Sequence, residues 1–167
     1  TSNLGADVTS SGIQTYTGAV TLSGGGTRTL GAGGNLLTFL STVDAAAAEN
    51  LTITGDVDFV NTVGGTGALG DIAVTGDLEV VVGTGAIVDA GAITAATATI
   101  DGAIGVGSTV TSVVIAGATT LGANVETTGI QTYTGATTLS GDTLLDAGGV
   151  LTFGNTVNGT GVGTESL

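Results

Sequence analysis

Four acidic residues recur at a spacing that could bind a metal ion. Asp56 and Asp58 alternate along one stretch, and Asp77 and Glu79 repeat the pattern 21 residues later. If the two stretches stack, like charges lie about 5 Å apart, which is unfavourable unless water, salt or a cation intervenes. Calcium is the natural cation because it prefers oxygen ligands. These four residues are therefore a candidate calcium site, and the alternative is a solvated acidic surface that keeps the chain soluble.

Carboxylates alone could also hydrolyse a glycosidic bond, for which Asp56, Asp58 and Asp77 are the candidates. Such a site needs an irregular groove with aromatic side chains that stack on sugars and basic side chains that position them. The chain has five aromatic residues and one Lys or Arg residue in total. We therefore expect no enzymatic activity and assign no catalytic residue.

The residue types that are missing exclude most other chemistry. The 167 residues include no Cys, His, Met, Trp or Pro, so thiolate, imidazole and disulfide chemistry cannot be assembled, and no cofactor other than calcium is predicted. Fourteen acidic residues stand against Arg28, which gives a net charge of -13 and leaves no basic surface for nucleic acid. No apolar run approaches the roughly 18 residues of a membrane span. Arg28 is expected to pair with a nearby carboxylate or to lie in a solvated loop.

Several polar and aromatic residues have a possible binding role. Tyr16 and Tyr133 could stack on carbohydrate, although packing over a glycine corner is the simpler expectation. Asn61 and Asn155 are expected to hydrogen-bond the backbone at corners, and the sequons at Asn50 and Asn158 matter only if the source glycosylates them. An ice-binding surface would need one Thr-x-Thr pair per turn of the chain, but the pairs are irregularly spaced, at 15 and 17, 27 and 29, 52 and 54, 97 and 99, 109 and 111, and 132 and 134.

The elements that position these residues are predicted to be short β-strands. Leu51, Ile53, Val57 and Phe59 alternate with polar residues, which is the period of a strand with one buried face, and Val, Ile, Leu and Thr suit a pleated surface. Gly-containing pairs such as TG, GG and NG separate the strands and provide turns. Hydrophobic residues reach 41% and charged residues 9%, a balance that indicates a folded chain rather than a disordered one.

Internal repeats organise these strands at two periods. Residues 4–24 and 121–141 are identical at sixteen of twenty-one positions with a constant offset of 117, so the chain divides into a copy at 4–120 and a partial copy at 121–167. Shorter echoes give a finer period near twenty, because LTITGDVDF at 51–59 resembles IAVTGDLEV at 72–80. The fine period predicts one continuous parallel β-solenoid over 1–167 with about 20 residues per coil. The alternative is a β-sandwich of 117 residues repeated in tandem.

The blocks GIQTYTGAVTLSG, LTF, FVNTVGGTG and LTITGD resemble the strand repeats of large bacterial surface proteins, the filamentous-haemagglutinin-like and autotransporter-type adhesins. The resemblance covers nearly the whole chain. It implies a right-handed parallel β-helix that is secreted to the cell surface. The resemblance also implies that the protein functions as a long rod, an adhesin or a matrix fibre.

These observations lead to one functional expectation. The chain is predicted to be a structural segment of an extracellular fibre or surface filament. The alternative is the stalk of a secreted adhesin whose ligand site is elsewhere, and an ice-binding solenoid is a more distant one. No polar cap is visible at either end of the repeats, so we expect a longer repeat array or end-to-end self-association. Neither nucleic acid nor a membrane is expected as a partner.

Overall fold

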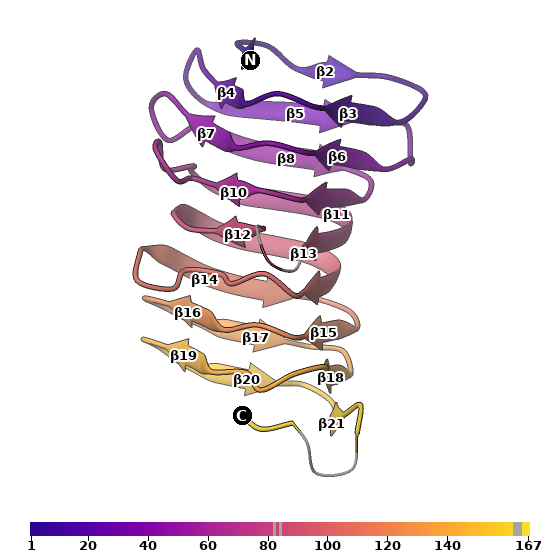
Figure 1. Cartoon of the computed structure of the whole chain (residues 1–167), viewed down its shortest axis with the longest axis vertical. Helices are drawn as coiled ribbons and strands as arrows, with labels where there is room; N and C mark the ends of the chain where they lie inside the picture. Colours follow the sequence, from indigo (N-terminus) through magenta and orange to yellow (C-terminus); the bar gives the residue numbers. More distant parts are fainter. Residues whose placement is uncertain (82, 84, 162–164) are drawn as a thin grey trace.

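Short parallel strands stack on one another along the long axis of the structure, a computed structural model (Figure 1). The structure describes residues 1–81, 83, 85–161 and 165–167. Within these ranges the chain forms strands, turns and bends, with no helix, and it winds through about eight turns. The predicted parallel β-solenoid is confirmed, and the tandem sandwich is wrong because each strand pairs with the strand one coil away and not with an antiparallel neighbour.

Each coil contributes strands to three sides. The first side contains β1 (Ser2–Leu4), β4 (Val20–Leu22), β7 (Val43–Ala45), β10 (Thr62–Val63), β12 (Ala86–Ile87), β16 (Val125–Thr127) and β19 (Leu145–Ala147). Single bridges from Ile104 to Ile87 and to Val125 connect its two groups of strands.

The second side contains β2 (Val8–Thr9), β5 (Thr27–Gly31), β8 (Asn50–Thr54), the first part of β11 (Ile72–Val80), the first part of β13 (Ala90–Ile100), β14 (Val110–Ile115), β17 (Gln131–Tyr133) and β20 (Leu151–Phe153). The third side contains β3 (Gln14–Tyr16), β6 (Leu37–Phe39), β9 (Val57–Phe59), the last residues of β11 and β13, β15 (Thr119–Leu121), β18 (Thr137–Leu139) and β21 (Val157–Gly159). Because β11 and β13 cross from one side to the next, these two sides form one sheet.

Alternation of side chains builds the interior. Leu51 and Ile53 are fully buried, while Thr52 between them is partly exposed, as the sequence predicts. Partners one coil apart are also apolar, since Leu51 pairs with Ile72 and Ile72 with Ile93. Full burial of one such side chain stabilises the fold by roughly 1.5–3 kcal/mol. The interior is therefore a set of ladders in which each apolar side chain contacts the next coil.

Glycines occupy corners that a larger residue could not. Gly64 has a φ of 74°, and a Cβ atom built on it would lie 2.0 Å from the carbonyl oxygen of Asp89 in the next coil. Both the left-handed conformation and the close approach of two backbones require glycine at this corner.

The 117-residue sequence repeat does not span a whole number of coils. Gln14 lies on the third side, where it pairs with Leu37, whereas its counterpart Gln131 lies on the second side, where it pairs with Val113. Five coils lead from Gln14 to Thr119, and the chain crosses two further sides before it reaches Gln131. The 117-residue repeat thus spans five and two-thirds coils, and the second copy presents the same residues on a different side.

Candidate functional site

The four acidic residues predicted to stack do stack, on the third side of the solenoid. Glu79 of β11 pairs with Asp58 of β9. The neighbouring pair follows the same register, because the carboxylate of Asp56 accepts a 2.9 Å hydrogen bond from the backbone N–H of Asp77. Asp77 in turn accepts a 2.5 Å hydrogen bond from the hydroxyl of Thr97 in the next coil. Two carboxylates of the cluster are therefore tied to the coil that follows them.

The other two carboxyl groups have raised pKa values. Burial raises the pKa of Asp58, and the negative charges of Asp77 and Asp56 raise it further, against a hydrogen bond with Glu79 that lowers it. Burial likewise raises the pKa of Glu79, and the charges of Asp58, Asp77 and Asp101 add to the effect. Each group resists ionisation first because burial disfavours its charged form and then because its neighbours carry the same charge.

The cluster does not form a closed set of metal ligands. Within the part of the chain that the structure describes, no group of three or more Asp, Glu, His or Cys side chains is arranged to hold a metal ion. Side chains on a strand side point outward in parallel, whereas calcium needs six to eight oxygens that converge. The calcium site at Asp56, Asp58, Asp77 and Glu79 stays a prediction.

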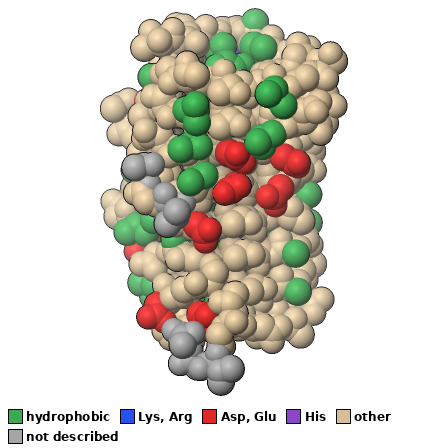
Figure 2. Space-filling view, turned by 45° about the vertical axis from the view of Figure 1, so that its right-hand side comes forward, with side chains coloured by type: hydrophobic (Ala, Val, Ile, Leu, Met, Phe, Trp, Pro, Cys, Tyr) green, Lys and Arg blue, Asp and Glu red, His purple; other side chains and the backbone are tan. Residues whose placement is uncertain are grey.

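Large apolar side chains lie next to this cluster. Ile13, Leu36 and Leu40 are 72%, 37% and 46% exposed. The register places Leu36 one coil before Asp56, because the neighbouring Leu37 pairs with Val57. Figure 2 shows acidic side chains gathered beside apolar ones on this face of the molecule. This third side is therefore both negative and apolar.

Several other acidic or amide side chains tie one coil to the next. Asp7 accepts a 2.8 Å hydrogen bond from the backbone N–H of Thr29, and Asp71 accepts one of the same length from Ala92. Asn50 does the same for Asp71. Sequence reasoning missed this role, although an Asp or Asn about one coil before a strand start is the signal that could have revealed it.

The two QTY motifs place polar groups inside the solenoid. Gln131 is fully buried and its amide donates 2.9 Å hydrogen bonds to the carbonyl oxygens of Val125 and Asp146, while Tyr133 donates a 3.1 Å hydrogen bond to its side-chain oxygen. Tyr133 stacks on Phe153 with ring centroids 5.5 Å apart, and burial raises its pKa. The prediction that Tyr133 packs over a glycine corner is wrong. Its ring is buried inside the solenoid, where Gln131 accepts the hydrogen bond of its hydroxyl.

The first motif repeats this arrangement on the third side. Tyr16 stacks on Phe39 and Phe39 stacks on Phe59, with centroids 5.1 and 5.3 Å apart. Gln14 donates a 2.7 Å hydrogen bond to the carbonyl oxygen of Gly31 and accepts one from the Tyr16 hydroxyl. Both tyrosine rings therefore stack on an aromatic ring of the next coil.

Arg28 is buried rather than paired with a carboxylate. Its guanidinium donates hydrogen bonds to the carbonyl oxygens of Ser23, Gly25 and Thr27. The nearby Glu49 is also buried and accepts N–H groups of Ala47 and Gly25. The prediction that Arg28 pairs with a carboxylate is wrong, because its guanidinium binds three carbonyl oxygens of the glycine-rich turn instead.

The remaining predicted positions lie at corners or on different sides. Asn61 and Asn155 each accept a hydrogen bond from the N–H of the residue that follows, as expected for corner residues. The sequon residue Asn50 is partly buried in β8, and Asn158 is exposed in β21. Strand positions place the Thr pair at 97 and 99 on the third side and those at 52 and 54 and at 132 and 134 on the second, so the pairs do not form one ladder.

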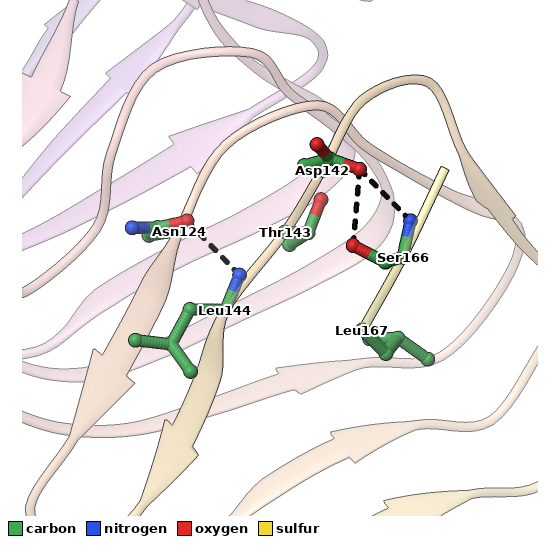
Figure 3. A pocket seen from close by; sticks show the side chains of 6 residues that line it. All are labelled: Asn124, Asp142, Thr143, Leu144, Ser166 and Leu167. Carbon is green, nitrogen blue, oxygen red and sulfur yellow. Dashed lines mark hydrogen bonds between the residues drawn. The ribbon is translucent and has the colours of Figure 1, made fainter. Parts of the chain in front are cut away.

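A shallow hollow lies far from the acidic cluster, near the C-terminal end (Figure 3). Its polar groups already have partners. The backbone N–H of Leu144 donates to Asn124 at 2.9 Å, and the N–H and hydroxyl of Ser166 donate to Asp142 at 3.1 and 3.0 Å. The residues that line it offer no pair of acid and base groups for catalysis.

Comparisons with protein-family models, with curated proteins and with solved structures find no match for this chain.

Proposed function

We propose that the chain is a structural segment of an extracellular fibre or surface filament, without catalysis. The observation that supports this proposal best is the continuous strand stacking on the second and third sides, from β2 and β3 at one end to β20 and β21 at the other. Side chains that could have formed a reactive site instead bind the backbone of the adjacent coil, as Asp7 and Asp71 do. Such repeated contacts hold successive coils in register, as a structural rod requires.

Electron microscopy of the purified chain and of its native source tests this proposal. A continuous rod with an axial repeat near 5 Å, the spacing of stacked strands, is the expected result. Isolated particles in both samples would contradict a fibre role. The same images report whether coils continue along one chain or subunits stack end to end.

The stalk of a secreted adhesin whose ligand site is elsewhere is the second candidate, and the same stacking of coils supports it. Monomers that bind cells or glycans without forming rods would favour the stalk over the filament. Export to the cell surface is part of both proposals.

A further inference from the structure

We propose that the third side docks a cationic, extended polypeptide segment that also carries apolar residues. The surface consists of Leu36, Leu40, Asp56, Asp58, Asp77 and Glu79, and we call it the third-side patch. This docking role goes beyond that of a structural rod.

The apolar part of the patch is specific to the first coils. Leu36 and Leu40 flank the buried strand residues of β6, and both point outward with 37% and 46% of their surface exposed. The corresponding outward positions two coils beyond the acids are Ala118 and Gly122, next to β15. Small residues therefore suffice for this side of the solenoid, and the leucines are not required by the fold.

The acidic part of the patch selects the charge of the partner. Four carboxyl groups lie within two adjacent coils, and the single basic side chain of the protein, Arg28, is buried among carbonyl groups of the turn that follows Leu22. A second copy of the chain has no exposed Lys or Arg to offer and would add further negative charge. Charge complementarity therefore favours a different, basic partner over self-association through this side.

The size of the patch favours a short segment. Leu36 and Leu40 are four residues apart, or about 13 Å along the strand, and the patch extends over three coils, or about 10 Å along the axis. This area is well below the roughly 800 Å² per partner of a stable protein interface, so it suits a peptide of a few residues. Asp58 and Glu79 are partners one coil apart, close enough for one arginine of the segment to contact both carboxyl groups, while its apolar residues cover the leucines.

Binding of synthetic peptides to the full chain tests the proposal. The probe is a fluorescein-labelled twelve-residue peptide in which Arg and Leu alternate, and the comparison peptide has Glu in place of Arg. Fluorescence anisotropy is measured at 20 mM and 500 mM NaCl, because salt screens charges over a few ångströms at the higher concentration. We expect the Arg peptide alone to bind, and to bind less tightly in high salt.

Matched variants locate the site. D58N/E79Q removes two charges from the patch, and E126Q/D146N removes two from a stacked pair on the first side, where Glu126 pairs with Asp146. The first variant should weaken binding about fivefold and the second less than twofold. Equal weakening by both would show attraction to net charge and would overturn the proposal.

A second pair of matched variants tests how much the apolar residues of the patch contribute to binding. L36S/L40S changes two exposed residues of the patch, and I130S/V150S changes two residues of the second side that are 45% and 65% exposed. We expect weaker binding in high salt for the first variant alone. Circular dichroism shows that each variant is folded before its binding is compared.

Two results would contradict the choice of partner. Binding of the Glu peptide as tightly as the Arg peptide would exclude a charge-selected site. Dimers in sedimentation velocity that L36S/L40S dissociates would show that a second copy occupies the patch. Rod formation is scored separately by microscopy, so failure of the docking proposal leaves the fibre proposal open.

Discussion

Among the residues that the structure describes, one buried side-chain hydroxyl has no hydrogen-bond partner. Thr137 points inward at the start of β18 and is fully buried, and its hydroxyl oxygen has no hydrogen bond within the described structure. The equivalent position in the first copy of the long repeat is Val20, which is also buried. The fold therefore accepts valine at this place in the repeat.

Thr137→Val should stabilise the protein. A methyl group of the same shape replaces a hydroxyl that gave up its water without gaining a partner, so the free energy of unfolding should rise by about 1 kcal/mol. Urea unfolding followed by circular dichroism measures the change. Thr138→Val, on the outward position next to it, is the control and should shift the free energy by less than about 0.5 kcal/mol. A loss of stability in Thr137→Val would reveal a hydrogen bond that the structure does not contain.

At the scale of the strands, the acidic pair of β9 and β11 makes stability depend on pH. The fold raises the pKa values of Asp58 and Glu79, so it favours their protonated forms. Their contribution to the free energy of unfolding is fully present below the pKa values of the unfolded state, about 4. It is lost as the pH rises through the higher pKa values of the folded state.

The wild-type protein should therefore gain thermal stability between pH 7 and pH 4 relative to D58N/E79Q, which has no such charges to neutralise. Melting temperatures measured at half-unit intervals of pH give the comparison. A parallel dependence of both proteins on pH would rule out repulsion within this pair as its source.

Glu49 should show the opposite dependence of stability on pH and therefore serves as a control. The hydrogen bond from the Ala47 N–H is the largest cause that lowers its pKa, so its contribution is present at neutral pH and disappears as pH falls through the folded-state value. Glu49→Gln should therefore lower the melting temperature at pH 7 and have little effect at pH 3.

The strands themselves were predictable from sequence, and the inward-facing polar residues were not. The period of two along a strand identified Leu51 and Ile53 as buried. The period of about twenty between coils predicted that Asp58 and Glu79 stack. Arg28 was expected in an ion pair or a solvated loop because arginine is usually exposed, and the sequence analysis assigned no role to Gln131. Their burial depends on backbone carbonyl groups from other coils, and those contacts exist only in three dimensions.

At the scale of the whole molecule, the rotation of the long repeat could not be read from sequence identity. Identity between Gln14 and Gln131 is a local match, whereas the side on which each residue lies depends on the summed lengths of all the coils between them. Partners one coil apart on the third side are separated by 18 to 23 residues, and these differences accumulate.

Paired fluorescent labels test this rotation directly. The chain contains no cysteine, so two introduced cysteines take pyrene maleimide at known sites. V114C/T132C should give excimer emission, because Val114 and Thr132 are partners on the second side. T120C/T132C should give monomer emission, because Thr120 lies on the third side. Monomer emission from V114C/T132C would contradict the placement of Thr132 on the second side and with it the rotation of the repeat.

The hydrogen bonds between coils give the rod a distinctive response to tension. They run along the long axis, as from the N–H of Val113 to the carbonyl oxygen of Ile130 in the next coil. A pull on the two ends therefore loads the bonds of one outer coil before those of the coil beneath it. Each coil that peels away frees about twenty residues, which extend by on the order of 65 Å. We therefore expect the chain to lengthen in discrete steps when it is pulled above a threshold force.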